Sequence, residues 1–456
     1  MPGSLSPPCH FCLASCPMAP RIRNRLHGQP GNLAHQGTPS LLVVLGMLHE
    51  AYFTRFITMR LSIYSLIVAA GLLGRVAARG IPKSSKSAAA YFITNEPTGN
   101  YVIAGSISNN GSLTLSTATP TGGNGSHNSA TGPDPFFSQG AVATVRHTSL
   151  LATVNAGSST VSLFFVNPLE PTNLTMIGSP VPSGGDFPIA LTFNHLGDNL
   201  CVLNGGADNG VQCFEVGSSG LSPISNSQRS LGLNQTTPPN GPPGSASTLV
   251  FAKNGASLVA ATKGLPGYVA VWDVAANGSL SIDFQKVNTP SGGGLIFSLT
   301  PIPGTEGAFL ASDPAVGYDI IDLSNPSNSQ SYTIANQSAN CWSTYSKKTG
   351  NYYVVDAPAG ILNEVSVDEN LQGSLVEQYS YANGSVPLDA AVATIDGADY
   401  LYQLLAGAKE VGVVSLASAG EGSVVQTVDI AAFGSEQGIT ISSDHLAGMA
   451  TYVSLL

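Results

Sequence analysis

Six segments of the chain share one pattern of hydrophobic and polar positions. Each has an apolar run rich in β-branched or aromatic residues, a short polar or Gly/Pro turn, and a second apolar run. They lie at 149–166, 199–216, 257–274, 308–323, 352–367 and 400–416. Paired runs of this length around a tight turn predict β-hairpins. A short strand precedes most hairpins and another turn and strand follow, so the repeating unit has four strands.

The hairpin turns recur at the spacing of propeller blades. Counted with a similar turn near the front of the chain, the residues that mark them are Asn95, Asn155, Asn204, Lys263, Asp313, Asp356 and Leu405. Their separations run from 43 to 60 residues, which is the size of a four-stranded blade. Helical periodicity is absent over any long window after Lys86. We therefore predict an all-β fold, a seven-bladed β-propeller of four-stranded antiparallel blades over 88–456.

Propeller rings usually close by sharing one blade between the two chain ends, because this removes free sheet edges. In this chain AYFITN, NYVIAGSI and SLTLST would supply three strands from the front, and GITISS the innermost strand from the back. The final GMATYV is then one strand too many. Either it displaces AYFITN or it adds an edge strand.

The segment before the repeats has the features of a secretory signal. Residues 59–78 begin with Met59-Arg60, continue with an apolar run and end on small residues at Ala78, as signal peptides do. We predict that 59–78 is a signal peptide and 79–87 a linker. Residues 1–58 show no foldable pattern. We interpret them either as residues outside the native protein, added by an over-extended gene model, or as an unstructured leader. A genuine cytosolic or anchoring leader is the alternative.

Composition supports an exported protein. Residues 79–456 carry a formal charge of about −15, which argues against nucleic acid and anionic membrane surfaces as partners. No segment is long and apolar enough for a membrane span, and we expect a secreted monomer, extracellular or attached to the cell wall. Seven glycosylation sequons agree with this: Asn110, Asn124, Asn173, Asn234, Asn277, Asn336 and Asn383.

Three cysteines follow the predicted signal. Cys201 and Cys213 occupy the two arms of one hairpin, at positions that can lie directly opposite one another. We predict a disulfide between them, with two separate buried thiols as the alternative. Cys341 would remain free.

Several stretches resemble a known family. YFITNEPTGNYV, GDFP, VAVWDV, CWSTYSKKTGNYYVVD and GMATYV are similar to secreted fungal glycoproteins described as 3-carboxymuconate cyclase-like. That family lies within the seven-bladed lactonase group that includes 6-phosphogluconolactonase. The resemblance covers Ala88 to the C-terminus. It implies a propeller whose ligand would meet the central channel, and an activity of the cycloisomerase or lactonase type.

In a propeller, innermost strands begin and middle hairpins turn on the same face, around the channel. The residues expected at this mouth are Asn95, Gln139, Asn155, Asp186, Asn204, Lys263, Asp313, Cys341 and Asp356. We predict that they form a candidate binding site without a metal or cofactor. The Asp and Asn residues have the oxygen ligands that Ca²⁺ prefers, but such residues at turns more often bond their own backbone. Cys341 is either a nucleophile or, more simply, a buried inert thiol.

Enzymes of the resembled group carry His and Arg where the innermost strands begin. In this sequence His147, His195 and His445 are expected at the opposite ends of those strands, which leaves Lys263 as the cation at the mouth. Two functions remain. The first is a non-catalytic glycoprotein that binds a small molecule, a glycan or a surface. The second is an enzyme, either an intramolecular lyase of the muconate cycloisomerase type or a lactonase.

Overall fold

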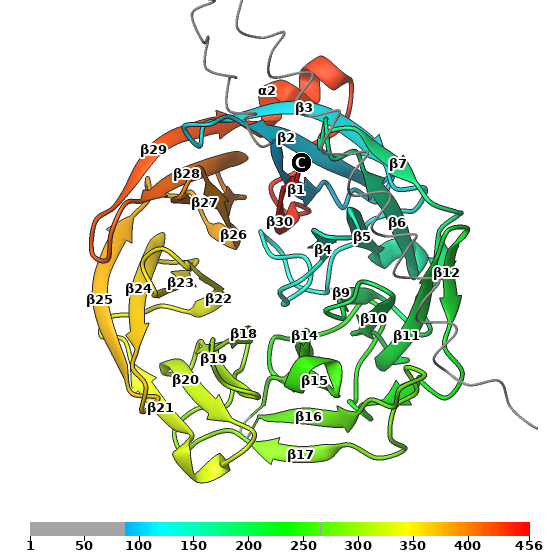
Figure 1. Ribbon diagram of the computed structural model, residues 1–456, viewed down its shortest axis with the longest axis vertical. Coiled ribbons are helices and arrows are strands. Elements are labelled where there is room, and N and C mark those ends of the chain that lie inside the picture. Colours follow the sequence, from blue (N-terminus) through cyan, green and yellow to red (C-terminus); the bar gives the residue numbers. More distant parts are fainter. Residues whose placement is uncertain (1–86, 265–266) are drawn as a thin grey trace, which may run out of the picture. The chain divides into compact units, whose positions relative to one another are not determined.

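The computed structural model describes residues 87–264 and 267–456. Within them, seven antiparallel sheets stand in a ring around a central axis (Figure 1). The predicted seven-bladed β-propeller is confirmed. The predicted leader, the signal peptide and most of the linker lie outside the described part of the chain. No helix of the described residues has the length and apolar character needed to cross a membrane.

The blades follow one another along the chain, and in each the first-named strand is the innermost. Blade 1 holds β30 (Ala447–Val453), β1 (Ala88–Ile93), β2 (Tyr101–Ile107) and β3 (Leu113–Pro120). Blade 2 holds β4 (Val142–Val145), β5 (Leu150–Asn155), β6 (Thr160–Val166) and β7 (Leu174–Met176), with β8 (Val181–Pro182) also on β6. Blade 3 holds β9 (Pro188–Phe193), β10 (Asn199–Asn204), β11 (Gly210–Gly217) and β12 (Gly220–Pro223), with β13 (Arg229–Ser230) also on β11.

The remaining blades have four strands each. Blade 4 holds β14 (Ala246–Ala252), β15 (Ser257–Thr262), β16 (Tyr268–Asp273) and β17 (Gln285–Asn288). Blade 5 holds β18 (Thr300–Pro301), β19 (Ala308–Asp313), β20 (Gly317–Asp322) and β21 (Gln330–Thr333). Blade 6 holds β22 (Asn340–Tyr345), β23 (Tyr352–Asp356), β24 (Ile361–Val367) and β25 (Gly373–Ser380). Blade 7 holds β26 (Pro387–Ile395), β27 (Ala398–Leu405), β28 (Glu410–Leu416) and β29 (Gly422–Asp429).

The burial of each strand follows its place in the blade. All six residues of β1, β5 and β15 are buried, because a second strand is covered on both faces by the neighbouring blades. Such strands are therefore almost continuously apolar. The outermost β25 and β29 are largely exposed and carry polar side chains. Each of the seven predicted turn residues lies at or just after the end of a second strand.

The ring closes through β30, which pairs with β1 inside blade 1. The prediction that GITISS forms the innermost strand is wrong, since residues 438–443 form no strand. They follow the helix α2 (Ile430–Gln437), which the sequence analysis missed. Its signals are the Asp429 carboxylate, which accepts from Ala432 N, and Gly438 with φ 69° after its last turn; both are common helix ends. GITISS forms the C-terminal cap of this helix and the loop that follows it, and GMATYV is the innermost strand.

Cys201 and Cys213 lie directly opposite each other in β10 and β11 and are joined by a disulfide. Both residues are almost fully buried in the core shared by blades 1 to 4. The cross-link therefore ties the two middle strands of blade 3, and Cys341 remains a buried free cysteine among the described residues.

Candidate functional site

Residues 121–140 join β3 to β4 and run into the centre of the ring (Figure 1). At its end the segment bonds to blades on different sides of the axis. Ser138 Oγ donates to Ile189 O of blade 3, and Gln139 N donates to Ser247 O of blade 4. Across the ring, Gln139 exchanges two side-chain hydrogen bonds with Ser343 of blade 6. We call residues 121–140 the plug, and the face where the innermost strands begin the plugged face.

Two consecutive phenylalanines anchor the plug. Phe136 packs edge-on against Phe187 at 6.1 Å between ring centroids, and Phe137 joins the cluster around Trp342. Phe137 and Phe187 both have positive φ, 53° and 54°, a conformation that costs a bulky residue about 1 to 3 kcal/mol. Buried contacts of the two rings offset this strain and hold the plug in one conformation.

Lys263, the cation predicted at the channel mouth, is only 1% exposed. It follows β15, and its ammonium group donates to two backbone carbonyls, Phe137 O of the plug and Ala246 O at 2.9 Å. The same group lies 4.9 Å from the centre of the Phe297 ring. Burial lowers the pKa of Lys263, while the charge of nearby Asp134 raises it. Lys263 therefore lies at the channel, and its hydrogen bonds go to the plug and to Ala246 of β14.

Two carboxyl groups lie at the centre of the ring: half-buried Asp134 beside Lys263, and buried Asp389 near Asp134. Asp134 accepts a hydrogen bond from Phe137 N at 2.8 Å, which closes a turn within the plug. Asp389, at the start of β26, accepts from Gly448 N of β30 at 3.0 Å and so ties blade 7 to blade 1. Burial raises the pKa of both carboxyls, that of Asp389 to about 7. The sequence analysis did not include either residue in the site.

Cys341 is buried in the same region, in the cluster that contains Phe137 and Phe297. Burial raises the pKa of its thiol well above the usual range. A thiol that stays protonated is a poor nucleophile. Its environment therefore favours the buried inert thiol over the nucleophile.

The predicted aspartates at the hairpin turns accept hydrogen bonds from backbone N–H groups of the protein. Asp313 accepts from the backbone N–H groups of Gly294, Leu295 and Ala315, and Asp356 from those of Ser338, Ala339 and Ala359.

The amides at corresponding turns, and Asp186, are also bonded within the protein. Asn95 exchanges hydrogen bonds with Ser126 of the plug, Asn155 bonds Asn100 and Ser162, and Asn204 donates to Ser183 O. Asp186 accepts from Thr237 Oγ1 at 3.0 Å. Such bonds leave little for a ligand. Only Asp313 and Asp356 also accept from N–H groups two or three residues on, at Ala315 and Ala359, as the Asx-turn interpretation requires. No group of three or more His, Cys, Asp or Glu side chains within residues 87–264 and 267–456 is arranged to hold a metal ion.

The predicted site is thus brought together only in part. Gln139, Lys263 and Cys341 lie around the buried end of the plug. The remaining predicted residues serve separate turns around the ring: Asn95, Asn155, Asp186, Asn204, Asp313 and Asp356.

His127 and His445 lie close together on the plugged face, although the sequence analysis expected His445 on the opposite face. His445 Nδ1 lies 3.0 Å from Glu96 Oε2, and the His445 ring lies 5.9 Å from that of His127 in the plug. The expectation for His445 is wrong because β30, and not GITISS, is the innermost strand. His445 therefore precedes that strand instead of following it.

Arg229 does not reach the channel. Its guanidinium donates to Ser281 O and Leu280 O at the edge of blade 4.

All seven sequon asparagines are exposed: Asn110, Asn124, Asn173, Asn234, Asn277, Asn336 and Asn383.

The sequence matches no protein-family model and no curated protein. Its structure, however, is similar to several solved propellers. A candidate 6-phosphogluconolactonase from Bacteroides fragilis superposes with a TM-score of 0.58 at 12% identity, over 81% of this chain and 99% of that one. The periplasmic gluconolactonase of Pseudomonas aeruginosa gives 0.57 at 15% identity, over 81% and 99%. A candidate 6-phosphogluconolactonase from Bacteroides uniformis gives 0.57 at 12%, over 81% and 100%. The described chain therefore has the seven-bladed fold of these lactonase-like propellers.

Proposed function

We propose that this protein is a secreted, N-glycosylated propeller, extracellular or bound to the cell wall, that binds a ligand without catalysing its conversion. The observation that carries the proposal is the placement of Lys263. Muconate cyclisation and lactone hydrolysis both develop negative charge, which an enzyme stabilises with positioned donors and cations. In this protein the ammonium group at the channel donates to Phe137 O and Ala246 O. A substrate anion would have to displace both.

Other features support the same conclusion. The plug fills the channel end at which a ligand of the lactonase-like fold would be expected. The mature chain is strongly acidic, which disfavours a trianion such as 3-carboxymuconate. Exposed sequons on several blades agree with an extracellular glycoprotein.

A lactonase or cycloisomerase is the second candidate, and one observation favours it. The pair of His445 and Glu96 has the arrangement in which a carboxylate orients an imidazole for proton transfer. The similar folds include the P. aeruginosa protein that is named a gluconolactonase.

Turnover assays distinguish the two candidates. Purified protein is incubated with glucono-δ-lactone and with 3-carboxymuconate, and conversion is followed by pH-stat and by absorbance. We expect no conversion above the spontaneous rate. Conversion that disappears in His445→Gln, at an unchanged melting temperature, would establish the enzyme instead. Glu369→Gln, an exposed acidic residue in the turn between β24 and β25, is the control variant.

A further inference from the structure

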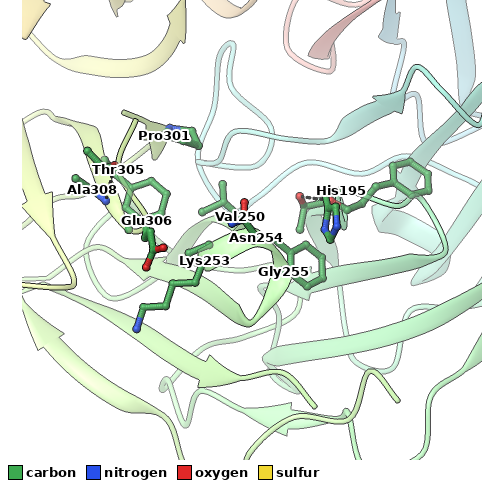
Figure 2. Close-up of a pocket in the computed structure, with 15 residues that line it drawn as sticks. His195, Val250, Lys253, Asn254, Gly255, Pro301, Thr305, Glu306 and Ala308 are labelled. Atoms are coloured by element: carbon green, nitrogen blue, oxygen red, sulfur yellow. Dashed lines mark hydrogen bonds between the residues drawn. The ribbon is translucent and has the colours of Figure 1, made fainter. Parts of the chain in front are cut away.

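The opposite face, where the innermost strands end, carries a pocket of about 380 Å³ between blades 3, 4 and 5 (Figure 2). Its walls come from the ends of β9, β14 and β18 and from the turns that follow them. Pockets of roughly 300 to 1,000 Å³ are typical of small-molecule sites. We call this surface the pocket face; its main residues are His195, Phe251, Lys253, Asn254, Glu306 and Phe309.

The floor of the pocket is apolar. Phe309 is buried, and Phe193, Val250 and Phe251 are half-buried, so parts of their surfaces remain open to the cavity. Aromatic and aliphatic surfaces of this kind pack against the C–H groups of a flat or puckered ring. Such a floor supplies contact area, whereas the choice of ligand depends on the polar groups around it.

Four polar side chains lie around the rim: His195, Lys253, Asn254 and Glu306. Lys253 and Glu306 are neighbours, because Lys253 N donates to Glu306 O at 2.9 Å, and His195 lies at the other end of the pocket (Figure 2). All four side chains are exposed, and among the described residues none of them has a hydrogen-bonding or ion-pair partner. Thr305, in contrast, donates to Ile302 O.

The rim is held in an unusual backbone conformation. Lys253 and Asn254 have φ of 49° and 53°, and Gly255 has φ of 90°. A Cβ atom at Gly255 would lie 3.2 Å from His195 Nδ1, so the turn approaches the histidine closely. Non-glycine residues with positive φ cluster at ligand sites because binding uses the geometry that the strain maintains.

We propose that this pocket binds a neutral saccharide of one or two sugar rings. The rim holds one ammonium group and one carboxylate, so its formal charge is balanced. A sugar hydroxyl can donate to Glu306 and accept from Lys253, and the Asn254 amide can do both. A carboxylate ligand would instead face Glu306 on a strongly acidic protein. The proposal rests on the proposed function, since it identifies the ligand of a binding propeller.

Saturation-transfer NMR on the full chain tests it. The probes are methyl β-D-glucopyranoside, N-acetylglucosamine and cellobiose as neutral sugars, with gluconate as the anionic counterpart. We expect saturation of at least one neutral sugar and weaker or no saturation of gluconate. Glu306→Gln and Asn254→Gly should each weaken the measured affinity about tenfold, which corresponds to the loss of one good hydrogen bond. Glycine at 254 adopts the same positive φ without strain.

Glu369→Gln, remote from the pocket, should leave the affinity unchanged. Absence of saturation for every neutral sugar, equal binding in Glu306→Gln and Asn254→Gly and the unmodified protein, or a preference for gluconate would each overturn the proposal. Hydrolysis of glucono-δ-lactone, measured separately, bears on the proposed function alone. A protein that turns over the lactone and also binds sugar through Glu306 would contradict the proposed function and retain the pocket.

Discussion

The two faces of the propeller place similar residues in opposite environments. The two lysines that flank β15 show this most clearly. Lys263 follows β15 on the plugged face, where it is buried and bonded to Phe137 O and Ala246 O. Lys253 lies before β15 on the pocket face, where it is exposed. A segment that crosses the axis covers the first lysine, whereas the second borders a cavity. A charged side chain at a channel mouth therefore indicates a ligand site only where it is not already bonded to another part of the protein.

The most destabilising change should be one that displaces the plug. In Gly125→Ala the new Cβ would lie 1.8 Å from Asn95 O, a backbone atom that cannot move aside cheaply. We expect the free energy of unfolding to fall by about 3 kcal/mol or more, measured by urea denaturation. Gly132→Ala is the control within the plug, because no atom lies within 4 Å of its Cβ position and only its φ of 91° is unfavourable. It should cost about 1 kcal/mol. Equal losses would show that the plug packs loosely.

The second prediction compares the lysines directly. Lys263→Ala leaves two buried carbonyls without their donor and opens a cavity, so unfolding should become easier by about 2 to 3 kcal/mol. This loss exceeds the 0 to about 1 kcal/mol of an exposed ion pair, because Lys263 is buried and bonds carbonyls. Lys253→Ala should change the free energy of unfolding by less than about 0.5 kcal/mol. Similar melting temperatures for the two variants would remove the distinction between the faces.

A pH-dependent effect concerns Asp389. Its folded pKa of about 7 lies above the ordinary value of 3.8 because the carboxyl is buried. The native state therefore retains a proton that the unfolded chain has lost, and stability falls as pH rises from about 4 to about 7. Asp389→Asn does not titrate, so its stability relative to the unmodified protein should rise over this interval.

At pH 8 the gain should reach up to about 4 kcal/mol, because a pKa difference of one between the folded and unfolded states corresponds to about 1.4 kcal/mol. Melting temperatures at pH 4, 6 and 8 measure it. Asp368→Asn, at an exposed turn in blade 6, should show no such trend. A difference between Asp389→Asn and the unmodified protein that stays constant from pH 4 to pH 8 would contradict the assignment.

The blades could be predicted from the sequence, because each is built from neighbouring segments. A turn residue such as Asn155 or Asp356 and two apolar runs specify a hairpin locally, and seven of them at regular spacing specify the ring. The sequence also placed Lys263 at the channel mouth and Cys201 opposite Cys213. These inferences require only strand alternation and turn chemistry, which act over a few residues.

The role of the channel mouth, in contrast, depends on contacts between distant segments. Lys263 and Phe137 are 126 positions apart, and no local pattern shows that residues 121–140 cross the axis to meet blades 4 and 6. The closing strand was assigned wrongly for the same reason, since GITISS and GMATYV are equally good strands by pattern. Long-range packing selects between such alternatives, because the free energy of burying a segment depends on which distant surface covers it.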